Sequence, residues 1–498
     1  MKNIFIGIDH GGTNTTALVF DLNKGVRSCE SVPMPKSTPQ EGIVEHNPDD
    51  FLNTSIQASK LALDKSNLDW NDVCAVAIAN QGETSMAWSK DEKKILGPAI
   101  SWEDRRTEEM CKSLKAKGVD KLIRKNTGIL LDPYFSATKF KWLLENNENI
   151  AAVHKKGKLR LGTTDTYVID RLTNGEAFVT DPGTASRTAL QNIYSGKWDS
   201  DLINAFNLEE RLLPKILKSI DNYGTIKHKD ISSSSINISG DVVDAHAALF
   251  AHGCMDSSKI KATYGTGAFI EINTGKEMVE PDGLLPVFIG WELENGVEYT
   301  LEGGVFSVGS AIDWSKKNGF IQDINKSAEV AQSIKETGNL FMIPSFTGLS
   351  APHWISSAKA SIFGLGLDHS QAHITKALLD GIAFQCSEII NLLKDKKKFL
   401  VNEVCADGGP SKNKYLMQRH ADLLGIQVSV SKEKNMTAYG AALLAAYGSK
   451  QITLNDLKKF KVEYETFEPK ISDDERESLW EKWKRNINLI KNIYKNEN

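Results

Sequence analysis

Three glycine-rich turns in this sequence have the residue types that bind phosphate. Residues 9–16 read Asp-His-Gly-Gly-Thr-Asn-Thr-Thr, residues 265–267 read Gly-Thr-Gly, and residues 407–409 read Asp-Gly-Gly. Glycine lets main-chain N–H groups approach an anion closely, and nearby hydroxyl groups supply further donors. The first turn has neither the GK[ST] of a Walker A loop nor the GxGxxG that opens a Rossmann helix. Taken alone, it is equally consistent with an ordinary tight glycine turn.

The segments around these turns are predicted to be strands. Residues 4–8 and 16–20 are rich in β-branched and aromatic side chains, so they predict a hairpin with Asp9 at its mouth. Residues 262–272 repeat the order strand, Gly/Thr turn, strand, and the third turn follows the apolar run 400–405. The similarity of the first two units indicates a weak internal repeat, and therefore two related halves.

Helical patterns alternate with the strands. The strand-like run 73–79 follows an amphipathic stretch at 51–63, and residues 472–494 place apolar side chains at helical spacing. This alternation is typical of an α/β fold. The halves are predicted to meet near residue 245, which gives an N-terminal domain over 1–245 and a C-terminal domain over 246–498.

The composition is that of an ordinary globular protein. The chain has 498 residues, 41% of them hydrophobic, with 60 Lys and Arg against 64 Asp and Glu, a net charge of −4. This balance gives no electrostatic basis for binding nucleic acid or an anionic membrane. The six cysteines show no CxxC spacing, and no run approaches the roughly 18 apolar residues of a membrane span. With no signal-peptide core at the N-terminus, a cytoplasmic location is expected.

Longer motifs make the sequence similar to a known family, the FGGY carbohydrate kinases, and within it to the glycerol kinases. Residues 134–146 resemble the first signature of that family, and residues 362–380 resemble the second. The resemblance covers the chain from residue 4 to about residue 446, and its further matches lie at 80–84, 102–107, 180–188, 345–354 and 407–409.

The resemblance implies two ribonuclease H-like domains of the actin, Hsp70 and sugar kinase type, with an interdomain cleft. It also implies transfer of the γ-phosphoryl group of ATP to a hydroxyl group of a small polyol or sugar. Asp244 matches the catalytic base, which accepts the proton of the attacking hydroxyl. Asp9 matches the aspartate that holds Mg²⁺, a hard cation that prefers oxygen ligands.

The resemblance assigns two further groups of residues. The nucleotide is expected to contact Thr13, Asn14, Thr266, Gly309, Gly409 and Asn413. The acceptor is expected to contact Glu83, Trp102, Tyr134, Asp244 and Phe269, where aromatic rings form an apolar wall and polar groups bind hydroxyls. One departure concerns the phosphates, because a basic residue expected after the first turn is Thr16.

Two other departures concern the acceptor. Glycerol kinases have arginine before the glutamate of the pocket and glutamine after the catalytic aspartate, whereas this sequence has Gly82 and Ala245. Both changes remove donors and add volume, so a polyol or ketose of four or five carbons is the favoured substrate. His246 or Glu103 would then supply substitute contacts. The alternative is that water replaces the arginine head group and glycerol remains the substrate.

A different class is also open, namely an Hsp70- or actin-like ATPase of the same fold that phosphorylates no small molecule. The region 80–146 argues against it, since Glu83, Trp102 and Tyr134 have no reason to resemble a polyol pocket in such a protein. A homodimer is expected from the family resemblance, with neither nucleic acid nor membrane as a partner.

Overall fold

The computed structural model describes residues 2–91, 94–231, 236–396 and 399–494. The chain forms two compact units that interleave along the sequence. The first comprises Met1–Gly253, Gly275–Thr300 and Asn435–Lys461, and the second comprises Cys254–Thr274, Leu301–Lys434 and Val462–Asn498. The domain boundary near residue 245 stays a prediction, and limited proteolysis can test it.

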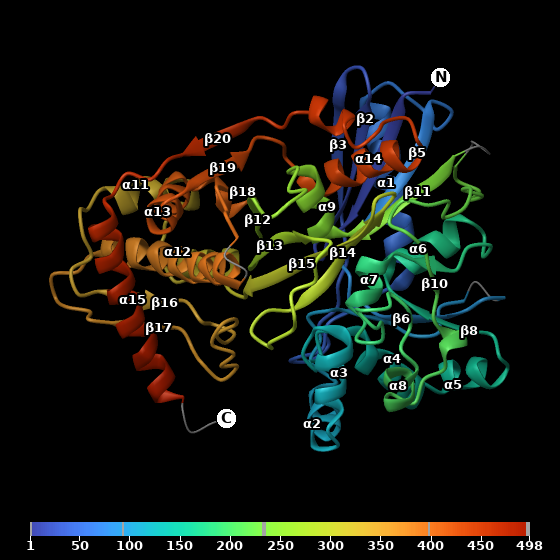
Figure 1. The fold of residues 1–498 in the computed structure, drawn as a ribbon, viewed down its shortest axis with the longest axis horizontal. Helices are drawn as coiled ribbons and strands as arrows, with labels where there is room; N and C mark the ends of the chain where they lie inside the picture. The colour runs from blue at the N-terminus through green and yellow to red at the C-terminus, as the bar shows by residue number, and fades with distance from the viewer. Residues whose placement is uncertain (1, 92–93, 232–235, 397–398, 495–498) are drawn as a thin grey trace. The chain divides into compact units, whose positions relative to one another are not determined.

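The first unit is built on a five-stranded sheet in the order β11-β5-β1-β2-β3 (Figure 1). β1 (Ile4–His10) pairs antiparallel with β2 (Asn14–Asp21), which confirms the predicted hairpin, and β2 pairs with β3 (Gly25–Pro33). On its other side β1 pairs parallel with β5 (Val73–Asn80), which pairs parallel with β11 (Asn237–Val243). Five of the seven β1 residues are apolar or glycine in sequence, as expected for a strand buried on both faces.

Helices from distant parts of the sequence cover this sheet. α14 (Met436–Gly448) packs on β1, β5 and β11, and α1 (Pro48–Lys65) packs on β2 and β3 (Figure 1). The approach of α14 to β1 is so close that a Cβ atom at Gly7 would lie 2.0 Å from the main-chain oxygen of Ala438. Glycine at this position therefore lets helix and strand meet.

Part of the first unit beyond this sheet forms a second core cluster around α4 (Ser136–Asn146). It includes a hairpin of β14 (Val287–Leu293) with the start of β15 (Gly296–Val305). The other elements of the first unit are β4 (Glu45–His46), β6 (Met86–Ser89), β7 (Ala99–Ile100), α2 (Glu108–Ala116), α3 (Val119–Thr127), α5 (Glu148–Lys155), β8 (Leu159–Gly162), α6 (Thr164–Leu172), β9 (Val179–Thr180), α7 (Pro182–Ser186), α8 (Ser200–Ala205), β10 (Lys215–Ile216) and α9 (Asp244–Ala251).

The second unit repeats the sheet of the first. Its strands follow the order β15-β13-β12-β18-β19-β20. β12 (Lys259–Tyr264) pairs antiparallel with β13 (Ala268–Gly275) and parallel with β18 (Glu403–Gly408), which pairs parallel with β19 (Gln427–Ser431). The last strand, β20 (Tyr464–Phe467), is antiparallel to β19. The relations of β12 thus match those of β1, which confirms the internal repeat.

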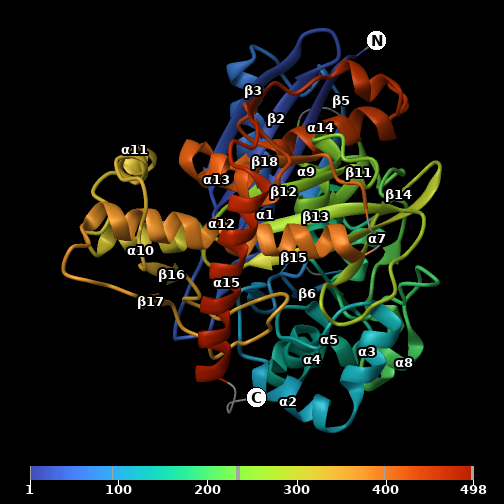
Figure 2. The same cartoon turned by 60° about the vertical axis from the view of Figure 1, so that its left-hand side comes forward.

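The C-terminal helix packs against two other helices of the second unit. α15 (Asp473–Ile493) begins after the N-cap Ser472, and it confirms the amphipathic helix predicted at 472–494. Trp483 of α15 stacks on Phe384 of α12 (Gln371–Lys396), and Trp480 donates to the oxygen of Leu423 in α13 (Lys414–Leu424). Figure 2 shows the ribbon of α15 crossing that of α12. The other elements are α10 (Gly309–Lys317), α11 (Ser327–Gln332), β16 (Phe341–Ile343) and β17 (Ser361–Phe363).

Candidate active site

Three parallel strands of the first unit end at one edge of its sheet. Asp9 of β1 is in register with Ala79 of β5, and the next β5 residue, Asn80, is in register with Val243 of β11. Asp244 follows directly as the first residue of α9. In open α/β sheets, ligands bind outside the carboxyl ends of the strands. The topology therefore brings Asp9, the segment 81–83 and Asp244 to one edge.

Asp9 is half-buried and is held by the helix that covers its strand. Asn435 donates from Nδ2 to Asp9 Oδ2 at 3.0 Å. The same side chain caps α14, because its Oδ1 accepts from the N–H of Ala438 at 2.7 Å. Asn435 is a positioning residue that the sequence analysis missed. Its separation of 426 residues from Asp9 leaves no signal in the sequence.

Asp244 and Ala245 are both half-buried at the start of α9. The N–H of Ala245 donates to Asp244 Oδ1 at 2.6 Å, which orients the carboxylate. Ala245 presents only a methyl group, so it offers no hydrogen bond to a ligand beyond its main chain. This position therefore lacks a side-chain donor, as predicted.

Glu83 is paired with an arginine that the sequence analysis did not assign to the pocket. Arg187 Nη1 lies 2.9 Å from Glu83 Oε1, and both side chains are 2% exposed. The guanidinium carbon also lies 4.1 Å from the ring centroid of Phe288. Burying two charges costs free energy unless they pair closely. The ion pair with Arg187 compensates the buried charge of Glu83 and holds its carboxylate in one orientation.

The arginine fills the space next to Gly82. A Cβ atom at Gly82 would lie 2.9 Å from Arg187 Cδ, and the residue has φ +78°. The prediction that Gly82 adds volume is therefore wrong, because Arg187 takes that space. A guanidinium is nevertheless present beside Glu83, supplied by Arg187. No sequence spacing signals this contact, since the partners are 104 residues apart.

Trp102 and Tyr134 form an aromatic corner in the same unit. Their ring centroids are 5.7 Å apart and their planes are inclined by 70°. A Cβ atom at Gly12, in the first glycine turn, would lie 3.8 Å from Trp102 Nε1. The structure thus brings one of the predicted acceptor residues close to a predicted phosphate-binding turn, with both rings half-buried.

The two substitute contacts are engaged elsewhere. His246 is fully buried, and its Nε2 lies 3.3 Å from Thr300 Oγ1. Its contact with the acceptor stays a prediction. Glu103 forms an ion pair of 2.9 Å with Lys36. Thr16, which stands where a basic residue is expected, is buried and bonds to Ser31 through hydroxyl groups 2.9 Å apart.

Three buried carboxyl groups lie behind this edge, on Asp165, Asp181 and Asp241. Asp181 caps α7, accepting from the N–H groups of Gly183 at 3.0 Å and Thr184 at 2.7 Å. Burial raises the pKa of Asp181 to about 6, and the charge of Asp165 adds to the rise. Burial and the neighbouring carboxylates also raise the pKa of Asp241 well above its usual range. Asp181 and Asp241 therefore retain protons at pH values where ordinary carboxyl groups lose them.

The second glycine turn lies against a helix N-terminus in the second unit. The N–H of Gly309, the first residue of α10, donates to the oxygen of Gly265 at 3.0 Å, and the N–H of Ser310 donates to Thr266 at 3.1 Å. A Cβ atom at Gly309 would lie 2.5 Å from the Gly265 oxygen, so only glycine fits. The structure thus joins two predicted nucleotide residues, Thr266 and Gly309, at the N-terminus of α10, where oxygens of the turn accept from the first N–H groups of the helix.

The third turn stands beside the second on neighbouring strands. Tyr264 is in register with Gly408, and Thr263 donates to Asp407 Oδ2 at 3.0 Å. A Cβ atom at Gly409 would meet no atom within 4 Å, so the main chain is open to a ligand there.

The remaining predicted residues are distributed between the units. Asn413 caps α13 and donates to Ser327 Oγ at 2.9 Å, so its amide already has protein partners. Its nucleotide contact stays a prediction. Thr13 and Asn14 are exposed in the first turn. Phe269 lies on β13 of the second unit, whereas the other four acceptor residues belong to the first.

Among the described residues, no group of three His, Cys, Asp or Glu side chains is arranged to hold a metal ion. A single carboxylate such as Asp9 suits Mg²⁺, which usually keeps several waters and binds through one or two carboxylates and the substrate phosphates. Within the same described ranges, no helix is long and apolar enough to cross a membrane.

Comparisons with known proteins match this geometry. The N-terminal domain of the FGGY family of carbohydrate kinases matches residues 4–251, and the C-terminal domain matches residues 260–449. The chain belongs to the FGGY family of carbohydrate kinases. It is similar to glycerol kinase 2 of Sulfolobus acidocaldarius, at 37% identity over 97% of this chain and 96% of that one. It is also similar to glycerol kinase of Petrotoga mobilis, at 36% identity over 99% of each chain.

Solved structures agree. The crystal structure of Plasmodium falciparum glycerol kinase with ADP has a TM-score of 0.91 and 31% identity over 98% of both chains. A ligand-bound xylulose kinase from Lactobacillus acidophilus has a TM-score of 0.86, also over 98% of both chains, at 21% identity, and shows the fold alone.

Family membership settles the class of enzyme. This FGGY kinase has the α/β, actin- and Hsp70-like fold predicted from the sequence, and it transfers a phosphoryl group from ATP, with Mg²⁺, to a small polyol or sugar. The alternative of an ATPase without a small-molecule acceptor is therefore wrong.

Proposed function

We propose that this kinase phosphorylates a linear polyol or ketose of four or five carbons, with Asp244 as the catalytic base. The observation that supports this substrate is Ala245. It lies half-buried beside Asp244 and has only a methyl group where the glycerol kinase pattern has a glutamine. A longer acceptor fills the room that a shorter side chain leaves, and it gains contacts that glycerol does not make.

In this proposal the first unit binds the acceptor through Glu83, Trp102, Tyr134 and Asp244. The aromatic corner of Trp102 and Tyr134 packs against the carbon chain, while the Glu83 carboxylate accepts from hydroxyl groups. Asp244 accepts the proton of the attacking hydroxyl. Little basicity is needed, because positioning and electrostatic stabilisation dominate phosphoryl transfer. Phe269, on β13, remains a predicted acceptor contact.

The proposed nucleotide and metal sites use the glycine turns. Asp9 would hold Mg²⁺, which neutralises charge on the phosphates, and Asn435 would keep the carboxylate oriented. Thr266 and Gly309 would contact the nucleotide where the second glycine turn packs against the N-terminus of α10. The open main chain at Gly409 suits close approach of the nucleotide, and Thr13, Asn14 and Asn413 complete the proposed set.

Glycerol is the second candidate acceptor, and a specific observation favours it. Arg187 places a guanidinium 2.9 Å from Glu83, so this part of the site has a cationic donor although residue 82 is glycine. Glycerol can remain the acceptor if water fills the space at Ala245. The relatives of 36–37% identity described above are glycerol kinases.

An acceptor panel tests the proposal. ADP release is measured with MgATP and glycerol, erythritol, threitol, xylitol, the arabitols, ribitol, xylulose or ribulose. A kcat/KM for one longer acceptor well above that for glycerol is the expected result. The variant Ala245→Gln should then shift the ratio toward glycerol, because the amide takes up the room and adds a donor. A higher kcat/KM for glycerol in the unaltered enzyme would refute the longer substrate.

A homodimer in the cytoplasm is the accompanying prediction. Analytical ultracentrifugation of the purified chain tests the first part, and cell fractionation tests the second. A chain of 55.0 kDa gives well-separated masses for monomer and dimer.

A further inference from the structure

A lysine side chain is fully buried beneath the acceptor residues. Lys139 lies on α4 and has no exposed surface. It stands four residues after Phe135 and four before Leu143, both buried, so it occupies a core-facing position of the helix. A buried ammonium group needs hydrogen-bond acceptors to offset its lost hydration.

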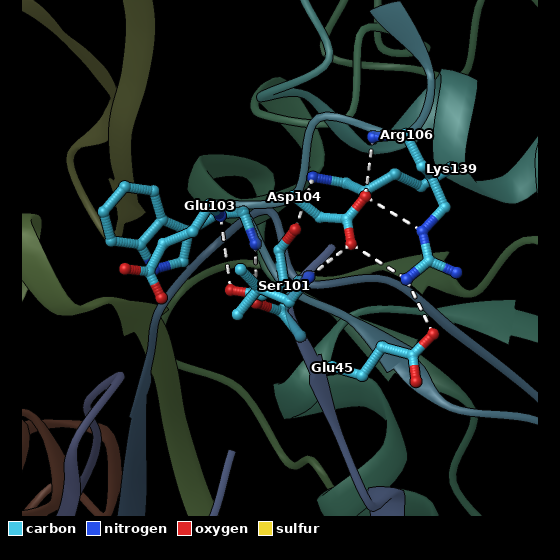
Figure 3. A network of polar contacts seen from close by, with 9 residues as sticks. Glu45, Ser101, Glu103, Asp104, Arg106 and Lys139 are labelled. Carbon is cyan, nitrogen blue, oxygen red and sulfur yellow. Dashed lines mark hydrogen bonds and ion pairs between the residues drawn. The ribbon is translucent and has the colours of Figure 1, made fainter. Parts of the chain in front are cut away.

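Those acceptors are main-chain oxygens of two segments that form the pocket. Lys139 Nζ donates to the oxygen of Tyr134 at 2.6 Å and to the oxygen of Ser101 at 3.5 Å. Figure 3 shows the lysine reaching toward Ser101. Tyr134 and Trp102, the residue that follows Ser101, are the two rings of the aromatic corner. One ammonium group therefore bridges the main chains behind both rings.

The third acceptor residue is tied to the same helix. Ser136, the first residue of α4, donates from Oγ to the oxygen of Glu83 at 3.1 Å. The neighbouring Thr84 Oγ1 accepts from the N–H of Trp102 at 3.3 Å. The N-terminal turn of α4 thus contacts the segments of Glu83, Trp102 and Tyr134.

A separate network of ion pairs holds residues 104–106, which follow Trp102 in the chain. Arg106 forms ion pairs with Asp104 at 2.9 Å and with Glu45 at 2.7 Å (Figure 3). Its guanidinium carbon lies 4.6 Å from the ring centroid of Trp142, on α4. At the pocket end of the segment the N–H of Ser101 donates to the oxygen of Val44 at 3.0 Å, and Lys139 ties this end to the main chain of Tyr134.

We propose that Lys139 is a positioning residue for the acceptor, whose ammonium group sets the separation of Trp102 and Tyr134 by binding the main chain at Ser101 and Tyr134. The inference rests on the proposed acceptor site, and it holds for glycerol as for a longer acceptor. Lys139 touches neither the reacting atoms nor the nucleotide. Its loss should therefore weaken acceptor binding and leave the binding of MgATP unchanged.

The charge of Lys139 is sensitive to pH. Burial lowers the pKa of its ammonium group to about 7, while the carboxylates of Glu83, Asp104 and Asp132 favour the charged form and Arg105 opposes it. A hydrogen bond from a charged donor is stronger than one from a neutral amine. The hold on both main-chain segments is therefore stronger below neutral pH than above it.

The test compares Lys139→Met with the unaltered enzyme, using glycerol and erythritol as acceptors. Methionine keeps the length and apolar body of the side chain but removes the donors. Loss of a charge-assisted hydrogen bond predicts a rise of about 10-fold or more in acceptor KM, with the KM for MgATP unchanged. Lys141→Met is the matched control, because Lys141 on the same helix pairs with Glu145 at 2.7 Å on the surface. It should change neither value.

An unchanged acceptor KM in folded Lys139→Met would overturn the proposal. Equal rises in both KM values would do so too, because a general loss of packing does not select one substrate. The unaltered enzyme gives an independent measurement if the variant fails to fold. Its acceptor KM should rise between about pH 6 and about pH 8 as Lys139 loses its proton, and a flat profile would contradict the inference. Absence of turnover with every acceptor of the panel in the unaltered enzyme would instead refute the proposed function.

Discussion

The strands around β1 in the first unit and around β12 in the second follow the same order. The two units differ in the residues at the ends of β1 and β12. In the first unit, β1 ends in Asp9 and His10 before a turn of residues 11–14. In the second unit, β12 ends in Thr263 and Tyr264 before the shorter turn 265–267. The first hairpin therefore offers a carboxylate at its mouth, and the second offers hydroxyl and main-chain groups. Both turns suit phosphate, and the first hairpin adds a carboxylate that suits a cation.

Buried charge pairs show a second difference between the units. Lys261 and Glu271 lie opposite each other on β12 and β13, 3.4 Å apart and fully buried, so this pair belongs to the sheet itself. Glu83 and Arg187 lie instead in segments that follow β5 and α7. A pair within a sheet supports the fold, whereas a pair beyond the strand ends can also shape a ligand site. Variants in the two units should separate these roles.

The largest expected effect is that of Asp244→Asn. Loss of the proton acceptor should lower kcat by about 10³-fold, because general base catalysis contributes 10²–10⁴-fold. Steady-state ADP release measures the loss, and calorimetry should show unchanged MgATP binding. The matched change Asp407→Asn, at the end of β18 in the second unit, should have a much smaller effect on kcat. Normal turnover by Asp244→Asn would remove Asp244 from the role of base.

Breaking a buried pair comes next. Glu83→Gln leaves the Arg187 charge without its carboxylate partner, so the free energy of unfolding should fall by about 4 kcal/mol and the acceptor KM should rise. Glu271→Gln should lower stability similarly without changing the acceptor KM. Chemical denaturation and steady-state kinetics of both variants check this. The distinction between the two pairs would fail if Glu271→Gln also raised the acceptor KM.

The buried Asp181 predicts a pH dependence of stability. Its folded-state pKa of about 6 lies above the reference value of 3.8, so the stabilisation is fully present below about pH 4 and is lost as the pH rises through 6. Asp181→Asn keeps a side-chain cap for α7 but has no proton to lose. The stability of the variant relative to the unaltered enzyme should therefore increase by about 3 kcal/mol between pH 4 and pH 7. Denaturant titrations across this range measure it, and parallel profiles would contradict the assignment.

The smallest expected effect compares the two hairpins. Asp9→Asn should raise the Mg²⁺ concentration for half-maximal activity roughly tenfold, as for other groups that hold a metal through water. Thr266→Val should raise the KM for MgATP without altering the Mg²⁺ requirement. Titration of activity with Mg²⁺ at fixed ATP distinguishes the two. Equal shifts in the Mg²⁺ requirement of the two variants would show that the first hairpin has no separate role in binding the metal.

Much of the fold was predictable because it depends on local patterns. Alternating apolar runs and glycine turns predicted the hairpins of β1 with β2 and of β12 with β13, and both were confirmed. The spacing of Trp480, Trp483 and Ile487 predicted α15. The interleaving of the units was not predictable in this way. α14 joins the sheet of the first unit after a separation of more than 350 residues from β5, through close packing that has no local signal.

The sequence by itself determined the class of this protein, the family and the identity of Asp9, Glu83 and Asp244 as candidate residues, because short motifs retain the residue types that the chemistry needs. Only the tertiary structure decided what surrounds them. Arg187 fills the space at Gly82, and Lys139 lies beneath the aromatic corner. The physical reason is that a buried charge is defined by its partners, and those partners come from segments that meet only when the chain folds.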